Sequence, residues 1–383
     1  MRVLLLSHVS DLYGAGRSLL ALAQGLQERG HVPLVVVPRR GDLSHSLASK
    51  DIDCSEVECP WWATPPESGP RHKLYAMRGI FRSAIKLRRV IRHFKPDIVH
   101  TNSAVIPSGA LAARWDGIPH VWHLREYGVE DYGLRFFLGR AVSGYLVGLF
   151  SRAIVAISRS VAQAYQAPRM GECLHVVYNG IDWPADVPLP DRNPTARRRS
   201  APPTLVLLGA LHPAKGQAEA IEATAELKRH GVRCTLRLVG GDVVGYRARL
   251  EELVQRLGIS DEVIFAGYHP DPMIEFLEAD VVLVCSRCEA FGRVIVEAML
   301  AQRPIVAANT CGTLELIEDD FNGVLYRAGD PVHLAERIVA LLDDPAWAGQ
   351  LGATARKVAR ERFSVARYVH GVEAVYKRVL AGK

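Results

Sequence analysis

Each half of the chain opens with the same succession of elements: a short apolar strand, a loop and a helix. In the first half, Met1–Ser7 has the pattern of a buried strand, Gly14 and Gly16 stand in the following loop, and apolar spacing predicts a helix over Ser18–Arg29. The same order begins again at Thr204–Gly209. Strands that alternate with helices build parallel sheets covered by helices, so we predict an α/β fold with Rossmann-like domains.

The length of the chain fits two such domains, because 383 residues are too many for one ordinary core. A stretch rich in Pro, Arg and Asp, residues 184–203, has the composition of an interdomain connection. We therefore predict a first domain over residues 1–190, a linker over 191–203 and a second domain over 204–360. Helical periodicity continues through the remaining residues, 361–383.

The composition is that of a soluble globular protein, with 49% hydrophobic and 23% charged residues. The N-terminal apolar run is too short for a signal sequence. No uninterrupted apolar segment reaches the roughly 20 residues that span a bilayer, and the nearest, Gly133–Phe150, contains Arg135 and Arg140. We expect a cytoplasmic protein.

The cysteines and the closely spaced aspartates predict neither disulfides nor a metal. Seven cysteines are an odd number at scattered positions, which argues against a disulfide framework. Cys285 and Cys288 form a single C-x-x-C with no second pair at zinc-site spacing. Asp51 and Asp53 match a D-x-D metal pattern, but they fall in an expected surface turn. We therefore expect no metal and no cofactor.

The stretch Cys288–Leu300 carries the strongest indication of chemistry. It follows an apolar strand, Asp280–Cys285, and opens a helix expected to start near Phe291, so backbone N–H groups converge on a spot suited to an anion. Glu289 would lie at the mouth of that spot and Glu297 on the second turn, roughly 9 Å along. Carboxylates bind vicinal diols, so this arrangement suggests a sugar nucleotide. The spacing also allows a second interpretation, in which Glu289 caps the helix and Glu297 is solvated.

These residues closely resemble a motif of the retaining glycosyltransferases of family four, two glutamates separated by seven residues. The resemblance covers Glu289–Met299, with the sequence EAFGRVIVEAM, and continues through Arg303–Ala308, Cys311–Ile317 and Asn322–Tyr326. It implies the GT-B fold, in which two Rossmann-like domains face each other across a cleft and a last helix, here within 361–383, crosses back to the first domain. It also implies retaining transfer from a nucleotide diphosphate sugar at a metal-free site.

The resemblance assigns the donor mainly to the second domain. Glu297 would bind the ribose diol and Glu289 the sugar hydroxyls, while Lys215 and the helix start would balance the charge of the leaving diphosphate. The catalytic candidates are His123, Lys215 and Glu289. The predicted donor-binding residues are Gly14, Gly16, Gly209, Lys215, Gly240, Gly241, Tyr268, Glu289, Phe291, Gly292, Arg293 and Glu297.

Two departures from the family's pattern bear on this site. Ala210 stands where the family has an arginine beside the diphosphate, so His212, Arg287 or Arg293 would have to replace its charge. The loop at Gly14 reads Gly-Ala-Gly, where two adjacent glycines are usual. Because this arginine is missing, a catalytically silent protein that only binds a sugar nucleotide is an alternative to an active enzyme.

The first domain gathers polar residues at predicted strand ends, where ligands bind in open α/β sheets. His100 and Asn102 belong to one strand end, and His123 and Glu126 to the next. His123 resembles the family's strand-end histidine, which contacts the donor sugar near its transferred carbon. Arg17, Asn102 and Glu126 are the candidates for the acceptor side.

The segment Arg71–Lys95 concentrates basic residues among Leu, Ile and Phe, in a chain of net charge +6. Such a helix can lie on an anionic membrane surface, which would favour a lipid-linked glycan or glycolipid acceptor and a peripheral location on the inner face of the cell membrane. A solvated helix packed on the first sheet is the other interpretation.

We therefore predict a retaining glycosyltransferase that moves a sugar from a UDP- or GDP-sugar to a glycan, glycolipid or natural product, in polysaccharide or glycolipid assembly, with no nucleic-acid partner. An NADP-dependent oxidoreductase is an alternative, with Arg39 and Arg40 meeting a 2′-phosphate. Against it, Leu19 occupies the third glycine position of G-x-G-x-x-G. A GT-B epimerase is a closer alternative.

Overall fold

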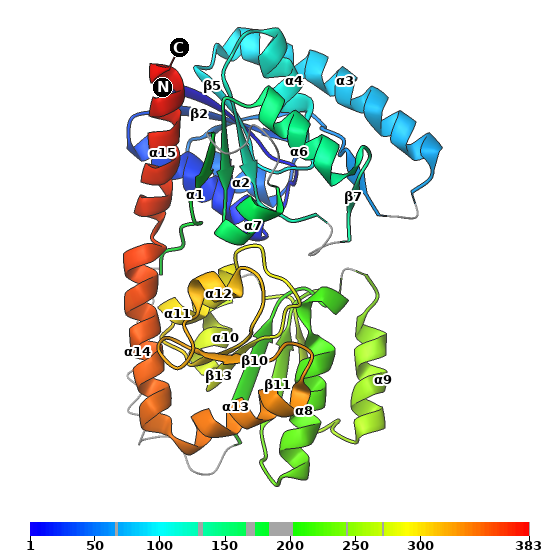
Figure 1. Cartoon of the computed structure of the whole chain (residues 1–383), viewed down its shortest axis with the longest axis vertical. Helices are drawn as coiled ribbons and strands as arrows, with labels where there is room; N and C mark the ends of the chain where they lie inside the picture. The colour runs from blue at the N-terminus through cyan, green and yellow to red at the C-terminus, as the bar shows by residue number, and fades with distance from the viewer. Residues whose placement is uncertain are drawn as a thin grey trace. The chain divides into compact units, whose positions relative to one another are not determined.

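The computed structural model describes residues 1–65, 68–128, 133–165, 173–183, 202–242, 244–269 and 272–382. The chain divides into two compact units (Figure 1). Unit 1 consists of Met1–Gly180 together with Ser364–Lys383, and unit 2 of Ile181–Phe363. The predicted linker, residues 191–203, lies outside the described residues except for its last two.

The core of unit 1 is a parallel sheet, in which the described residues form seven strands in the order β3-β2-β1-β5-β6-β8-β9. The strands are β1 (Arg2–Leu6), β2 (Val32–Val37), β3 (Asp53–Glu56), β5 (Ile98–Thr101), β6 (His120–Leu124), β8 (Ala153–Ala156) and β9 (Leu174–Val176). The order reverses between β1 and β5. Ligands of such sheets bind beyond the carboxyl ends of the strands at this switch point.

Helices cover both faces of this sheet (Figure 1). Val3 and Leu5 of β1 share a core with Leu22 and Val372 of the helices on one face, while Gly109 of a helix on the other face packs against Leu6. The first face carries α1 (Gly14–Glu28), α2 (Asp42–Ala48) and α15 (Val365–Ala381), and the second α3 (Pro70–Phe94), α4 (Ser108–Trp115) and α6 (Gly139–Phe150). Unit 1 also contains α7 (Arg159–Ala164) and the antiparallel pair of β4 (Ala63–Thr64) with β7 (Arg135–Phe136).

The first helix begins earlier than its apolar spacing predicts. It starts at Gly14 instead of Ser18, so Gly14 and Gly16 lie in its first turn. A Cβ at Gly16 would stand 2.0 Å from the carbonyl oxygen of Asp11. Glycine is therefore required by close packing inside a helix, and because it adds no apolar side chain, hydrophobic periodicity misses this turn.

Unit 2 is built on a second parallel sheet, in which the described residues form six strands in the order β12-β11-β10-β13-β14-β15. The strands are β10 (Thr204–Leu208), β11 (Thr235–Val239), β12 (Val263–Gly267), β13 (Val281–Val284), β14 (Ile305–Ala308) and β15 (Val324–Tyr326). The order reverses between β10 and β13, so the switch point of this sheet lies beyond those two strand ends. Both units thus have the strand order of a Rossmann-like domain, as predicted.

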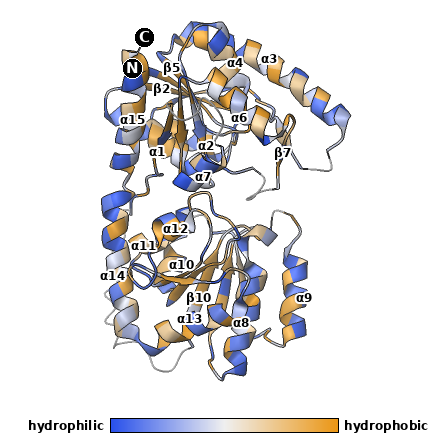
Figure 2. Cartoon of the chain, in the orientation of Figure 1, coloured by the Kyte–Doolittle hydropathy of each residue, from blue (hydrophilic) through white to orange (hydrophobic). Residues whose placement is uncertain are grey.

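The helices of unit 2 pack apolar faces onto this sheet, whose strands are largely hydrophobic (Figure 2). They are η1 (Pro213–Lys215, a 3₁₀ turn), α8 (Gln217–Arg229), α9 (Arg247–Leu257), α10 (Met273–Glu278), α11 (Arg293–Leu300), α12 (Thr313–Leu316), α13 (Pro331–Asp343) and α14 (Pro345–Arg362). Among the helices of the described part of the chain, none combines the length and the apolar character needed to cross a bilayer.

Candidate active site

The switch point of unit 2 brings a lysine and a glutamate into contact. Lys215 ends η1, which follows β10, and Glu289 lies in the loop that follows β13. The distance from Lys215 Nζ to Glu289 Oε1 is 2.6 Å. The same carboxylate oxygen accepts a hydrogen bond from Ser286 Oγ, also at 2.6 Å. Both side chains are partly buried, so the ion pair is held in a defined position at the edge of the sheet.

A glycine explains why these two segments can approach each other. Gly216 has a φ of +70°, in the left-handed region, and a Cβ there would stand 2.0 Å from the carbonyl oxygen of Cys285. Any other residue would push η1 and the start of α8 away from the end of β13. The Lys-Gly pair of the sequence thus places the charge of Lys215 beside the loop of Glu289.

Glu297 is buried on α11 and does not lie in solvent. Its side chain is 3% exposed, and its Oε1 lies 2.9 Å from Arg293 Nε one turn earlier. The helix begins at Arg293, two residues later than predicted, because Gly292 adopts a φ of +87° and serves as the N-cap. Glu289 does not cap this helix, since its partners are Lys215 and Ser286. The interpretation with a capping Glu289 and a solvated Glu297 is therefore wrong.

The other predicted donor residues of unit 2 lie along the same edge of the sheet. Gly209, Gly240 and Gly241 follow β10 and β11, and a Cβ at Gly240 would stand 2.0 Å from the carbonyl oxygen of Gly209. Tyr268 follows β12 and is exposed. Phe291 is different, because its ring is buried edge-on against Phe363, with ring centroids 5.8 Å apart. Its side chain is part of the core.

The structure shows the state of the three residues that were expected to replace the charge of the arginine missing at Ala210. His212 Nδ1 accepts a hydrogen bond from the backbone N–H of Ala214, and burial followed by the charge of Lys215 lowers the pKa of His212. This histidine is therefore neutral at pH 7 and adds no positive charge. Arg293 is paired with Glu297, and the side chain of Arg287 is exposed.

A disulfide joins Cys288 to Cys311, which corrects the expectation drawn from the odd cysteine count. The bond connects the residue before Glu289 to the loop after β14, and the backbone N–H of Gly312 donates to the carbonyl oxygen of Glu289 at 2.9 Å. The other cysteine of the C-x-x-C, Cys285, is buried and free, and burial raises its pKa to about 12. The cysteine count could not reveal this bond, because the two bonded residues come from neighbouring strand ends of the sheet.

In unit 1, a buried arginine that the sequence analysis did not select connects four elements. Arg125 follows β6 directly, and its guanidinium donates to Asn102 Oδ1 (2.5 Å), Asn179 Oδ1 (2.7 Å) and the hydroxyl of Tyr368 (2.6 Å). Asn102 in turn contacts the start of α1 through Ala15 O, at 3.4 Å. Arg125 stands between the predicted residues His123 and Glu126, so its position directly after a strand was the available signal.

The remaining acceptor-side candidates make contacts inside unit 1. Glu126 accepts from Ser103 Oγ (2.5 Å) and from the backbone N–H of Ala104 (2.7 Å), which holds the loop after β5. Arg17 Nε donates to the carbonyl oxygen of Leu12 at 2.9 Å. These contacts shape the strand-end loops at the switch point.

His123 belongs to a buried row of three polar side chains. The hydroxyl of Tyr376 lies 2.8 Å from His100 Nδ1, and His100 Nε2 lies 3.2 Å from His123 Nδ1. Burial first, and the charge of Arg125 second, lowers the pKa of both histidines well below the usual value, so both are neutral. Among the described residues, His123 Nε2 is buried without a hydrogen-bond partner. The row couples the tautomer of His123 to that of His100, since each neutral ring donates through one nitrogen and accepts through the other.

A third histidine at a strand end, besides His100 and His123, was missed in the sequence. His8 follows β1, at the same switch point as Asn102. Loss of solvation and then the charge of Arg125 lower its pKa to about 4. No described atom is hydrogen-bonded to its Nδ1. Its place just after the first apolar strand was the signal in the sequence.

No three His, Cys, Asp or Glu side chains of the described residues are arranged to hold a metal ion.

Comparison with known proteins matches both halves of the chain to described families. Residues 13–183 match the family described as Glycosyltransferase Family 4, and residues 192–358 match Glycosyl transferases group 1. A D-inositol 3-phosphate glycosyltransferase 1 of Catenulispora acidiphila is 31% identical over 308 residues, which cover 75% of this chain and 73% of the relative. A glycogen synthase of Mycobacterium tuberculosis is 28% identical over 295 residues, covering 73% and 68%.

Solved structures show the same fold over the whole length. Anabaena Alr3699/HepE, solved in complex with UDP and glucose, has a TM-score of 0.80 and 25% identity, and covers 98% of this chain and 99% of its own. The same protein was also solved in complex with UDP-glucose. The sucrose-phosphate synthase of Thermosynechococcus elongatus has a TM-score of 0.77 at 19% identity, which bears on the fold alone.

Proposed function

The chain belongs to the GT-B glycosyltransferases of family four, and we propose that it transfers a hexose from UDP-hexose to a membrane-associated acceptor with retention of the anomeric configuration. Its relatives support the activity of a glycosyltransferase that uses a nucleotide sugar. The choice of UDP rests on the complexes of Anabaena HepE with UDP and with UDP-glucose.

The observation that carries the proposal is the contact of Lys215 with Glu289 at the switch point of unit 2. A diphosphate that arrives there would take over the positive charge of Lys215 and release Glu289 to accept hydrogen bonds from sugar hydroxyls. Glu297, already buried and ionically paired, would accept from the two ribose hydroxyls. A fixed cation aimed at a leaving diphosphate stabilises the charge that develops in the transition state.

We assign the charge balance of the leaving group to Lys215, to the backbone N–H groups before α11 and to no metal ion. Retention would follow from a front-face reaction, in which the departing phosphate oxygen takes the proton of the acceptor hydroxyl as the sugar bond forms on the same face. His123, held neutral in its row, would offer a hydrogen bond to the sugar. Unit 1 would supply the acceptor side.

The exposed basic side of α3 favours an acceptor at an anionic membrane surface over a small soluble one. Two of its arginines are committed elsewhere, because Arg88 and Arg92 both bind Asp116. The remaining cations of the helix face solvent. A peripheral location on the inner face of the membrane, with a lipid-linked glycan or glycolipid as acceptor, is consistent with this distribution.

A thermal-shift screen with UDP, GDP and their sugars tests the donor. A ligand at 100 times its dissociation constant adds about 2.7 kcal/mol of stability, so one diphosphate should raise the melting temperature clearly. Glu297→Ala should remove most of that shift, while the exposed Glu336→Gln of α13 should keep it. Response to NADP without response to any diphosphate would refute the proposal. Binding of a nucleotide sugar without turnover would show that the chain is the catalytically silent binder suggested by the arginine missing at Ala210.

A further inference from the structure

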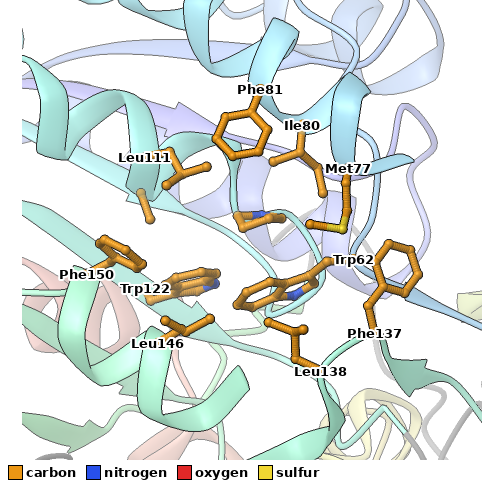
Figure 3. A pocket seen from close by; sticks show the side chains of 12 residues that line it. Trp62, Met77, Ile80, Phe81, Leu111, Trp122, Phe137, Leu138, Leu146 and Phe150 are labelled. Carbon is orange, nitrogen blue, oxygen red and sulfur yellow. The ribbon is translucent and has the colours of Figure 1, made fainter. Parts of the chain in front are cut away.

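Unit 1 contains an apolar pocket that the donor and acceptor assignments do not use. It lies between α3, α4 and α6, and its floor is made by the indole rings of Trp62 and Trp122, which stack with centroids 5.7 Å apart (Figure 3). Met77 and Phe81 of α3 line it from one helix, and Leu146 of α6 from another. We call this space the tail pocket.

The tail pocket offers nothing polar to a ligand. All of the described residues that line it are apolar or aromatic. The two indole N–H groups are already used, because Trp62 donates to the carbonyl oxygen of Ala104 at 2.8 Å and Trp122 to that of Ser103 at 2.7 Å. A sugar or a nucleobase would lose its hydrogen bonds with water on entering. The pocket therefore suits a hydrocarbon.

The pocket has a volume of about 140 Å³ and opens at the surface. A dry apolar cavity of about 150 Å³ accommodates benzene, so the tail pocket has room for about six carbon atoms of a chain. Met77 and Phe81 line it and are nevertheless 43% and 50% exposed, which marks them as its rim. A chain end or a branched segment could enter from outside without rearrangement of the core.

Apolar side chains continue outward from this rim on both helices. On α3, four of the five exposed large hydrophobic residues recur every three or four positions and thus share one side of the helix; they are Leu74, Met77, Phe81 and Ile85. On α6, the exposed apolar residues follow the same spacing and are Val142, Tyr145 and Leu149. A binding surface that fills the pocket would also remove water from both rows of apolar side chains.

A row of cations borders the apolar side of α3. Exposed basic residues recur at spacings of three, four and seven, and we call them the cationic face: Arg71, Arg78, Arg82, Lys86 and Arg89. Neither α3 nor α6 contains an aspartate or a glutamate. An occupant of the tail pocket would therefore be attracted most strongly if its polar end carried a negative charge.

We propose that the tail pocket holds a hydrocarbon tail of an anionic lipid in a bilayer, while the lipid phosphate lies against the cationic face of α3. The apolar rows of α3 and α6 then enter the boundary between headgroups and acyl chains, as in interfacial helices. A protein partner fits these features less well, since a pocket of this size takes a single narrow chain and the cations need a dense negative surface. Lipid binding at this site requires neither donor nor turnover, so it is tested independently of the proposed transfer reaction.

The first experiment measures binding of the full-length protein to vesicles of phosphatidylcholine with and without phosphatidylglycerol. Binding should require phosphatidylglycerol and weaken as salt is raised. Arg78→Glu with Arg82→Glu should weaken it by at least about 30-fold, because each cation near an anionic surface contributes roughly fivefold. Arg233→Glu with Arg256→Glu, exposed positions of unit 2, makes the same change in net charge and should have little effect. Equal binding to neutral vesicles would overturn the proposal.

The second experiment tests whether the hydrocarbon tail of the lipid enters the tail pocket. Phosphatidylglycerol brominated on its acyl chains should quench the fluorescence of Trp62 and Trp122, which form the pocket floor. Ala110→Phe, which fills the pocket from α4, should lose much of this quenching while it keeps salt-dependent binding. Quenching of equal size in the variant, at an unchanged melting temperature, would show that no tail enters.

A measurement on the unmodified protein covers the case in which Ala110→Phe does not fold. Affinity for soluble alkyl phosphates should rise about fourfold per methylene as the chain lengthens and then level off once the pocket is full. Affinity that does not depend on chain length would contradict a tail site.

Discussion

Lys215 and Glu289 are 74 residues apart in the chain and 2.6 Å apart in the structure, at the two strand ends that flank the switch point of unit 2. Each comes from a loop that follows a different strand, β10 or β13. A pair of opposite charges at this point keeps both side chains in place before a ligand arrives. The pair also balances the two charges in the absence of a donor; under the proposed function, Lys215 would offer its positive charge to the diphosphate once Glu289 binds the sugar.

We expect Lys215→Met to reduce the turnover number by about 10²–10³, the range found when a single preorganised group for a developing negative charge is removed. Lys215→Arg keeps the charge and should retain more activity. The measurement is release of UDP from UDP-hexose with and without acceptor, together with the affinity for UDP. A turnover number within threefold of the unmodified enzyme would mean that the diphosphate does not meet this lysine.

The stability of unit 1 should fall as the pH is lowered below about 6.5. His8 and His120 have folded-state pKa values of about 4 and 3, and those of His100 and His123 are also lowered, in each case mainly by burial. As the pH falls below 6.5, a histidine with a lowered folded-state pKa binds its proton in the unfolded protein before it does so in the folded protein. Each such histidine therefore lowers the free energy of unfolding by up to about 1.4 kcal/mol per pH unit below pH 6.5. The loss continues down to about pH 4 for His8 and pH 3 for His120.

Urea unfolding at several pH values between 7 and 4 measures this slope. His120→Asn should reduce the slope of the unfolding free energy against pH by the contribution of up to one proton. The exposed His72→Gln serves as the matched control. A stability that stays constant from pH 7 to pH 5 would contradict the role of the buried histidines.

Removal of the disulfide should affect both stability and donor binding. Cys288→Ser opens a loop of 23 residues, for which chain entropy gives a loss of about 3 kcal/mol. It also frees the segment in which the backbone of Glu289 bonds to Gly312, so the affinity for the donor should weaken. Thermal melts and UDP titration, with and without dithiothreitol, measure these effects. The exposed Cys54→Ser should change neither quantity; insensitivity of the unmodified protein to dithiothreitol would indicate that the bond is not formed in solution.

Arg125→Met should destabilise unit 1 by at least about 3 kcal/mol, because it leaves the buried polar groups of Asn102, Asn179 and Tyr368 without their common donor. Arg125→Lys should recover only part of this, since a lysine cannot reproduce the planar fork that reaches three acceptors. Denaturant unfolding measures the difference. A loss below about 1 kcal/mol for Arg125→Met would show that water replaces the guanidinium.

The sequence alone determined the alternation of strands and helices, the presence of two Rossmann-like units and the glycines at their strand ends. These features depend on local periodicity and on backbone conformation, which neighbouring residues control. It also indicated the two glutamates of the motif. Hydrophobic spacing could not locate the first turn of α1, where glycines replace apolar side chains, nor show that Gly292 delays the start of α11 to Arg293.

Only the tertiary structure decided which distant residues meet. The bond of Cys288 to Cys311, the approach of Lys215 to Glu289 and the contact of Arg125 with Tyr368, 243 residues away, all depend on the order of the strands in the sheets. The tail pocket likewise exists because α3, α4 and α6 cover the same sheet face around two tryptophans. Local patterns predicted Rossmann-like units but not which loop side chains meet, since parallel strands are joined by long connections and these contacts join residues far apart in the chain.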